Sequence, residues 1–123
     1  MLTIDGSPLG VDDLVAVARD GVPVEIGEVA RRRMAPSLAL IERLDARGEA
    51  VYGVTTGFGA LADRPIGPAQ RAELQRAVVR SHAAGMGPPL PAEVVRGMLL
   101  LRARSLAAGH SGVRPELPEA ICA

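Results

Sequence analysis

Residues 91–109 read PAEVVRGMLLLRARSLAAG, and this stretch decides the class of fold. Pro91 suits the first turn of a helix and Gly109 suits its end, so we predict a helix over Pro91–Ala108. The middle of this helix is apolar almost all the way round, at Val94, Val95, Met98, Leu99, Leu100 and Leu101. Such a helix needs partners on every side, and a chain of 123 residues supplies few. We therefore expect a larger body or another subunit to cover it.

The composition of the whole chain also favours helices. Hydrophobic residues make up 48%, but there is no Trp, one Tyr and one Phe, so Ala, Val, Leu, Ile and Met supply the apolar surface. The formal net charge is zero, which argues against a nucleic-acid or membrane partner. The only cysteine, Cys122, cannot form an internal disulfide, and no apolar run is long enough to span a bilayer. We expect a cytoplasmic protein with no metal site.

The remaining helices and strands follow from periodicity and from turn residues. Two short strands are expected at Leu2–Ile4 and Ala50–Val54. Three more helices are expected at Gly10–Arg19, Glu25–Arg47 and Pro68–Ala84. Pro36 should kink or split the second of these helices, since it lacks a backbone N–H. The run Arg31–Arg33 points to several sides of the same helix, so we expect it to be solvated or salt-bridged.

A long loop, predicted over Tyr52–Pro68, contains the stretch VYGVTTGFGAL at residues 51–61. Glycines on either side of Tyr52 let the backbone approach other groups closely. A phenol has an ordinary pKa of about 10 and acts as a base only where its site lowers that value. From the residues alone, the simpler interpretation is a tyrosine whose hydroxyl caps a backbone group. A phosphate-binding loop is poorly supported, because GVTTGFG has neither the lysine of a Walker loop nor the GxGxxG pattern.

Three segments in order carry a resemblance to a known family. They are VYGVTTGFGALA (51–62), LQRAVVRSHAAGMGPPL (74–90) and VRGMLLLRARSLAAGHSGVRPEL (95–117). The chain resembles, from about residue 24 to residue 117, the amino-terminal segment of the histidine and phenylalanine (aromatic amino acid) ammonia-lyases, and is most similar to histidine ammonia-lyase. The resemblance implies the helical fold of the fumarase/aspartase-like superfamily. Residues 1–123 would then form a single, incomplete amino-terminal domain with one or two short strands and a long glycine-rich loop.

The resemblance also implies roles for individual residues. Tyr52 matches the family's loop tyrosine, which is proposed to remove the β-proton of the substrate, and the residues that form this loop are Gly53, Gly57, Phe58 and Gly59. His82 matches the position that contacts the side chain of the substrate, where His implies histidine, or tyrosine as the second choice. Without the resemblance, a histidine near the end of a helix usually just interacts with free carbonyl groups. His110 is expected to be structural.

The cofactor of this family is methylidene-imidazolone, an electrophile made from an internal Ala-Ser-Gly, and the chain contains no Ala-Ser-Gly. The resemblance therefore implies that the cofactor belongs to a downstream part and that this chain alone is inactive. The expected partners are a small amino acid substrate, the remainder of the lyase as a continuation or separate chain, and further copies in a homo-oligomer, a tetramer in the family.

Several alternatives stay open at this point. A tyrosine ammonia-lyase, an aminomutase or a non-catalytic helical interaction module would all fit. Ala123 is equally compatible with a natural terminus, the edge of a split gene or an artificial boundary. Pro115 and Pro118 stand where the family continues as a helix, so we expect that helix to be shortened or broken.

Overall fold

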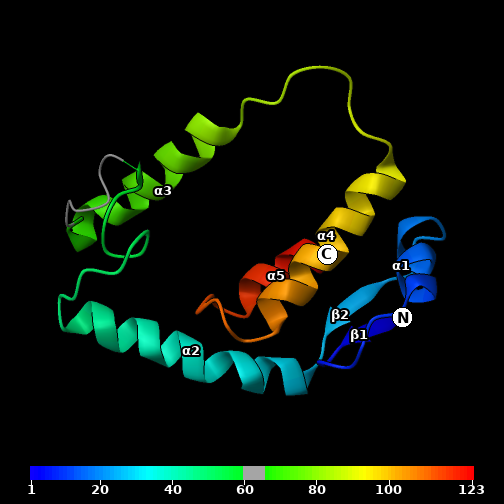
Figure 1. Ribbon diagram of the computed structural model, residues 1–123, viewed down its shortest axis with the longest axis horizontal. Coiled ribbons are helices and arrows are strands. Elements are labelled where there is room, and N and C mark those ends of the chain that lie inside the picture. Colours follow the sequence, from blue (N-terminus) through cyan, green and yellow to red (C-terminus); the bar gives the residue numbers. More distant parts are fainter. Residues whose placement is uncertain (60–65) are drawn as a thin grey trace. The chain divides into compact units, whose positions relative to one another are not determined.

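The computed structural model describes residues 1–59 and 66–123, and it is mainly helical, as predicted (Figure 1). Within these residues there are five helices and one two-stranded sheet. In chain order the elements are β1 (Leu2–Ile4), α1 (Val11–Ala18), β2 (Val24–Ile26), α2 (Glu28–Ala46), α3 (Pro68–His82), α4 (Ala92–Ala107) and α5 (Glu116–Cys122). The chain divides into two compact units, here called the first unit (Met1–Leu40 with Pro89–Ala123) and the second unit (Ile41–Pro88).

The sheet of the first unit is formed by β1 and β2, which pair in parallel with Ile4 opposite Ile26. Both isoleucines are buried, whereas Glu25 between the two apolar residues of β2 is exposed. The strand at Leu2–Ile4 was predicted, but the helix predicted from Glu25 was not correct at its start. The alternation of Val24, Glu25 and Ile26 has the period of a strand, and α2 begins only after Gly27.

The hydrophobic core of the first unit lies where α4 meets the sheet and its neighbouring helices. The helix packs against α1 on one side and α5 on another, and α5 also contacts β2. The buried core residues are Ile4, Val17, Ile26, Ala30, Met34, Leu100, Ala103 and Ala107. The alanines among them have small side chains, which lets the helix backbones approach closely. On the rest of α4, the apolar residues Val94, Val95, Met98, Leu99 and Leu101 are exposed.

The ends of α4 agree with the prediction. Pro91 is the residue before the first helical position, and Ala108 caps the carboxyl end. Gly109 follows with φ +86°, a left-handed conformation that few residues other than glycine adopt. A Cβ atom on Gly109 would lie 2.4 Å from the carbonyl oxygen of Arg33, so the helix end sits directly against the backbone of α2.

Two helices predicted to be interrupted at prolines are continuous, whereas a kink at Pro36 and a shortening of the last helix stay predictions. Pro36 does not split the predicted helix, because α2 continues unbroken from Glu28 to Ala46 with Pro36 inside it. The prolines after Arg114 do not break the last helix either. Pro115 stands just before α5, and Pro118 is its third residue, where a backbone N–H has no partner within the helix. Both prolines are therefore compatible with the first turn of α5.

The arginine run on α2 is solvated or salt-bridged, as predicted, since all three residues are exposed and two of them form salt bridges. The guanidinium of Arg31 lies 2.7 Å from the carboxylate of Glu119 on α5 and 3.7 Å from that of Glu28. Arg32 also lies 3.7 Å from Glu28. The hydrogen bond to Glu119 raises the pKa of Arg31 above its ordinary value, which keeps this side chain charged.

The second unit contains the end of α2, the turn after it, and α3. The strand predicted at Ala50–Val54 is not formed, because the N–H groups of Val54 and Thr55 both donate to the carbonyl of Val51 and close a turn instead. The predicted helix at Pro68–Ala84 is confirmed as α3, with Pro68 in its first turn and His82 as its last residue. Residues 60–65 of the predicted loop lie outside the described residues. No helix of the described ranges combines the length and hydropathy needed to cross a membrane.

Candidate functional site

Tyr52 lies in a compact turn at residues 51–59, here called the tyrosine turn. The carbonyl of Val51 accepts hydrogen bonds of 3.0 Å from the N–H groups of both Val54 and Thr55. Gly53 within it has φ +70°. A Cβ atom at that position would lie 2.9 Å from the ring of Phe58, so the ring packs directly on the glycine. The turn therefore depends on a glycine for both its backbone conformation and its packing.

Two buried threonines hold this turn together. The hydroxyl of Thr55 accepts a 2.8 Å hydrogen bond from the N–H of Val51 and donates a 2.7 Å hydrogen bond to the carbonyl of Glu49. The hydroxyl of Thr56 accepts from the N–H of Gly53 at 3.3 Å and lies 3.1 Å from the carbonyl of Gly57. Thr55 is 6% exposed and Thr56 is 2% exposed. Among the described residues, these two have the only buried polar side chains. Burial makes these bonds expensive to lose.

The side chain of Tyr52 projects from the turn and is 65% exposed. Its ring meets that of Phe58 edge to face, with the centroids 6.1 Å apart and the planes at 86°. The N–H of Gly59 donates to the phenol oxygen over 3.4 Å, which is long for such a bond. The structure thus brings Tyr52, Gly53, Phe58 and Gly59 together around one phenol group, and Gly57 is buried in the same turn.

His82, the last residue of α3, is exposed and makes its described contacts within that helix. Its Nδ1 lies 2.9 Å from the carbonyl oxygen of Val78 and 3.0 Å from the hydroxyl oxygen of Ser81. The hydroxyl of Ser81 donates to the same carbonyl over 3.0 Å. In the described part of the chain, no hydrogen bond or ring contact joins His82 to the tyrosine turn. His110 is exposed and belongs to the first unit.

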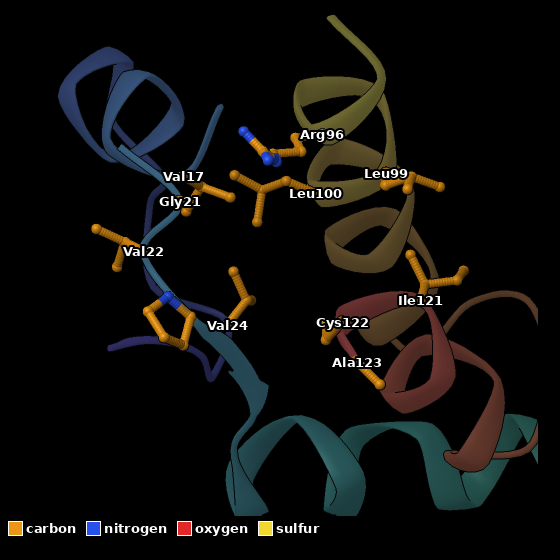
Figure 2. A pocket seen from close by; sticks show the side chains of 11 residues that line it. Val17, Gly21, Val22, Val24, Arg96, Leu99, Leu100, Ile121, Cys122 and Ala123 are labelled. Carbon is orange, nitrogen blue, oxygen red and sulfur yellow. The ribbon is translucent and has the colours of Figure 1, made fainter. Parts of the chain in front are cut away.

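The cavities of the first unit do not contain these residues. One cavity of about 430 Å³ lies between the β2 segment, α4 and α5, and its walls are mostly apolar side chains such as Val17, Val24 and Leu100 (Figure 2). Arg96 lies at its edge and donates to the carbonyl of Ala18. Burial raises the pKa of the Cys122 thiol on the wall above its ordinary value. None of the predicted site residues lines this cavity, and no cluster of metal ligands occurs among the described residues.

Sequence reasoning did not identify the threonine pair or Ser81. Both were visible as sequence, in the TT of YGVTTGFG and in the serine directly before His82. A hydroxyl group gives no periodicity signal, so its role becomes clear only from the groups that surround it.

The chain combines a mainly helical fold with a tyrosine in a glycine-rich turn. Comparison with known proteins identifies the class of protein to which these features belong. The sequence profile described as aromatic amino acid lyase matches residues 9–123. The chain belongs to the aromatic amino acid lyase family.

Particular members of this family are similar to the chain in sequence or in fold. It is 53% identical over 108 residues to histidine ammonia-lyase of Streptomyces griseus, covering 88% of this chain and 21% of that protein. The fold matches the ergothioneine-degrading enzyme ergothionase of Treponema denticola with a TM-score of 0.93 and 31% identity, over 98% of this chain and 24% of the other. Tyrosine aminomutase of Streptomyces globisporus matches with a TM-score of 0.89 and 31% identity, over 98% and 23%. The chain spans a fifth to a quarter of the length of these proteins.

Proposed function

We propose that this chain supplies a base and a substrate-contacting residue to a histidine ammonia-lyase, which converts histidine to urocanate and ammonia. The observation that carries the proposal is the 53% identity to histidine ammonia-lyase over a region that includes the described tyrosine turn and α3. The complete enzyme acts in the cytoplasm in this proposal. The chain covers 21% of that relative, so the rest of the machinery must come from further sequence, as a continuation or as a separate chain.

Tyr52 is the proposed base that takes the β-proton of the substrate. Its exposure leaves the phenol accessible to a small molecule, while the ring contact with Phe58 restricts where the phenol points. Gly53, Gly57, Phe58 and Gly59 are the proposed loop-forming residues, since they shape the backbone and packing beneath Tyr52. A base acts by geometry first, so a turn that fixes the direction of the phenol supports this role.

His82 is the proposed contact to the substrate side chain. Histidine and tyrosine both carry polar rings, and an imidazole can exchange a hydrogen bond with either. A site with such a group disfavours an apolar ring, because the polar group then loses its partner. His82 is exposed in this chain, which leaves it accessible to a ring.

The electrophilic cofactor of the proposed enzyme is methylidene-imidazolone. The chain contains no Ala-Ser-Gly, so its own residues do not fit the formation of this group. In the complete enzyme, a part of the protein that contains Ala-Ser-Gly would form this group, which would supply an electrophile. This chain's residues contribute the proton transfer and the contact to the substrate.

The exposed apolar side of α4 is the proposed contact for the remainder of the lyase. Val94, Val95, Met98, Leu99 and Leu101 are all at least 40% exposed here, and together they form an unusually apolar surface for a helix in water. We further propose that residues 1–123 belong to one larger helical domain, and that the complete enzyme is a homo-oligomer.

The test is to co-express the chain with a downstream lyase portion that contains Ala-Ser-Gly and to assay histidine as substrate. We expect urocanate from the pair and none from the chain alone. Tyr52→Phe and His82→Gln should each reduce kcat/KM by at least 100-fold, a loss of about 3 kcal/mol of transition-state stabilisation. His110→Gln is the matched control, because it removes the only other histidine and should leave the activity unchanged. A folded, associated pair that releases no ammonia would overturn the proposal.

The same assay separates the second candidate, an aminomutase, which is favoured by the likeness in fold to tyrosine aminomutase. A lyase releases ammonia and leaves an unsaturated acid, whereas a mutase returns the amino group to the neighbouring carbon as a β-amino acid. A tyrosine ammonia-lyase would give an unsaturated acid from tyrosine and little product from histidine. If none of these substrates gives a product, the remaining alternative is a non-catalytic interaction module.

A further inference from the structure

We infer that Ser81 and the carbonyl of Val78 hold His82 in the tautomer with its proton on Nδ1, so that Nε2 faces the substrate as a hydrogen-bond acceptor. This inference rests on the proposed function only for what it says of the substrate. The tautomer itself is a property of this chain and can be measured without any activity.

The carbonyl oxygen of Val78 determines which ring nitrogen of His82 carries the proton. A carbonyl oxygen can only accept hydrogen bonds, and Nδ1 of His82 lies 2.9 Å from it. An Nδ1 without a proton would place its lone pair against those of the carbonyl at this distance, which is repulsive. The contact is therefore favourable only when Nδ1 carries the proton and donates it.

The position of Ser81 supports the same assignment. Its hydroxyl lies 3.0 Å from the carbonyl of Val78 and donates to it. When the hydroxyl proton goes to that carbonyl, the Ser81 oxygen, 3.0 Å from Nδ1, faces it with a lone pair. In this arrangement Nδ1–H points at two acceptors, the carbonyl and the hydroxyl oxygen. Ser81 is a positioning residue that acts through His82.

The consequence lies at the other ring nitrogen. In a neutral imidazole with Nδ1 protonated, Nε2 carries only a lone pair. No hydrogen bond to Nε2 forms among the described residues, and His82 is exposed, so a substrate ring that carries a donor can bind there in place of water. The imidazole N–H of histidine and the phenol O–H of tyrosine both qualify, whereas a phenyl ring and a ring bearing only acceptors do not. The tautomer thus sharpens the substrate class from polar rings to rings that donate.

The experiment is a long-range proton–nitrogen NMR correlation on the ¹⁵N-labelled chain, recorded well above the ordinary imidazole pKa of about 6.5. The His110→Gln variant serves as the parent for these spectra, because every imidazole signal then comes from His82. We expect Nδ1 to show the shift of a protonated ring nitrogen and Nε2 that of an unprotonated one. The opposite pattern, which a free imidazole side chain favours in water, overturns the inference.

Two substitutions of Ser81 in that parent test the positioning role. Ser81→Ala should lower the ratio of the Nδ1–H to the Nε2–H form several-fold, and Ser81→Thr should restore it because it returns the hydroxyl. Alanine is a better helix former than serine, so a lost tautomer preference in Ser81→Ala cannot come from a weakened α3. An unchanged ratio in Ser81→Ala removes Ser81 from the inference.

The activity assay then separates this inference from the proposed function. If the NMR assignment holds but His82→Gln leaves the lyase activity of the assembled enzyme intact, the proposed function of His82 fails and the tautomer stands. If His82→Gln abolishes activity but the proton is found on Nε2, the inference fails and the proposed function stands.

Discussion

The two units of this chain are stabilised in different ways. The first unit has a hydrophobic core, to which two strands and four helices contribute, and Met34 and Ala30 at its centre are at most 1% exposed. In the described part of the second unit, the buried side chains are the two threonines, and no apolar side chain is buried. The proposed functional residues, Tyr52 and His82, both lie in the second unit.

The two units therefore differ both in the interactions that stabilise them and in whether they contain the proposed functional residues. A core of packed apolar groups fixes the first unit by burial, at about 25 cal/mol for each Å² of apolar surface removed from water. The second unit is held by local hydrogen bonds, each of which contributes about 1 kcal/mol net because the same groups bond to water in the unfolded chain. We therefore expect the first unit to resist unfolding more than the second, whose conformation would depend on further partners.

The largest effect is expected from the core of the first unit. Met34→Ala removes a side chain that is 1% exposed and leaves a cavity, so we expect the free energy of unfolding to fall by about 2–5 kcal/mol. Met86→Ala is the matched control in the second unit, where Met86 is 98% exposed, and should change it by less than about 0.5 kcal/mol. Urea unfolding followed by circular dichroism measures both. Equal losses would contradict the contrast between the units.

The next effect concerns the contact between α4 and α2. Gly109→Ala combines a left-handed backbone with a Cβ atom 2.4 Å from the carbonyl oxygen of Arg33, and should cost about 2–4 kcal/mol. Gly21→Ala provides the comparison, since its φ of +68° is also left-handed but nothing lies within 4 Å. It should cost only about 1–2 kcal/mol. Identical losses in the same denaturation experiment would show that the Arg33 carbonyl moves away freely.

Gly109 and β2 show how far the sequence predicts the fold. Gly109 was expected to end the helix, because glycine after an apolar periodic run is a strong local signal. Its contact with Arg33 joins residues far apart in the sequence and has no such signal. The same limit explains β2, where Glu25 and Ile26 were assigned to a helix although their partner strand starts at Leu2.

The candidate site was predictable to a different degree. Tyr52 and His82 were chosen from motifs, and the glycines around Tyr52 indicated a tight backbone. The strand expected at Ala50–Val54 was wrong, although its β-branched residues favour a strand. The carbonyl of Val51 accepts from the N–H groups of Val54 and Thr55, and the N–H of Val51 donates to the hydroxyl of Thr55, so a turn forms instead. Hydrogen bonds from side chain to backbone compete with regular structure in this way, and propensities do not include them.

A third, smaller effect tests the hydrogen bonds of the second unit. Thr55→Val keeps the shape of the side chain but leaves the N–H of Val51 and the carbonyl of Glu49 without their partner, at a cost of about 1–3 kcal/mol. We expect faster hydrogen exchange at the amides of Val51 and Thr55. The same substitution at the exposed Thr3, whose hydroxyl bonds to Glu25, should change little in the first unit. Unaltered exchange in Thr55→Val would mean that other contacts hold the tyrosine turn.

The smallest effect is an acid sensitivity at Asp5 in the first unit. The N–H of Ser7 donates to the Asp5 carboxylate over 2.8 Å and, with the charge of Arg33 as a lesser contribution, holds the pKa of Asp5 below its ordinary value. A carboxyl whose pKa is lower in the folded chain than in the unfolded chain stabilises the fold above the unfolded value, and this contribution is lost as the pH falls through the folded value.

The free energy of unfolding should therefore begin to fall below about pH 4, and Asp5→Asn should reduce that slope while keeping an oxygen to accept from Ser7. An NMR titration of the Asp5 carboxyl gives the folded pKa directly, and a value at or above the ordinary one would remove the effect. Asp5 is only half-buried, so water screens its interactions and the change stays small beside that of Met34→Ala. A large acid effect from Asp5 alone would mean that charge, rather than the packed core, stabilises the first unit.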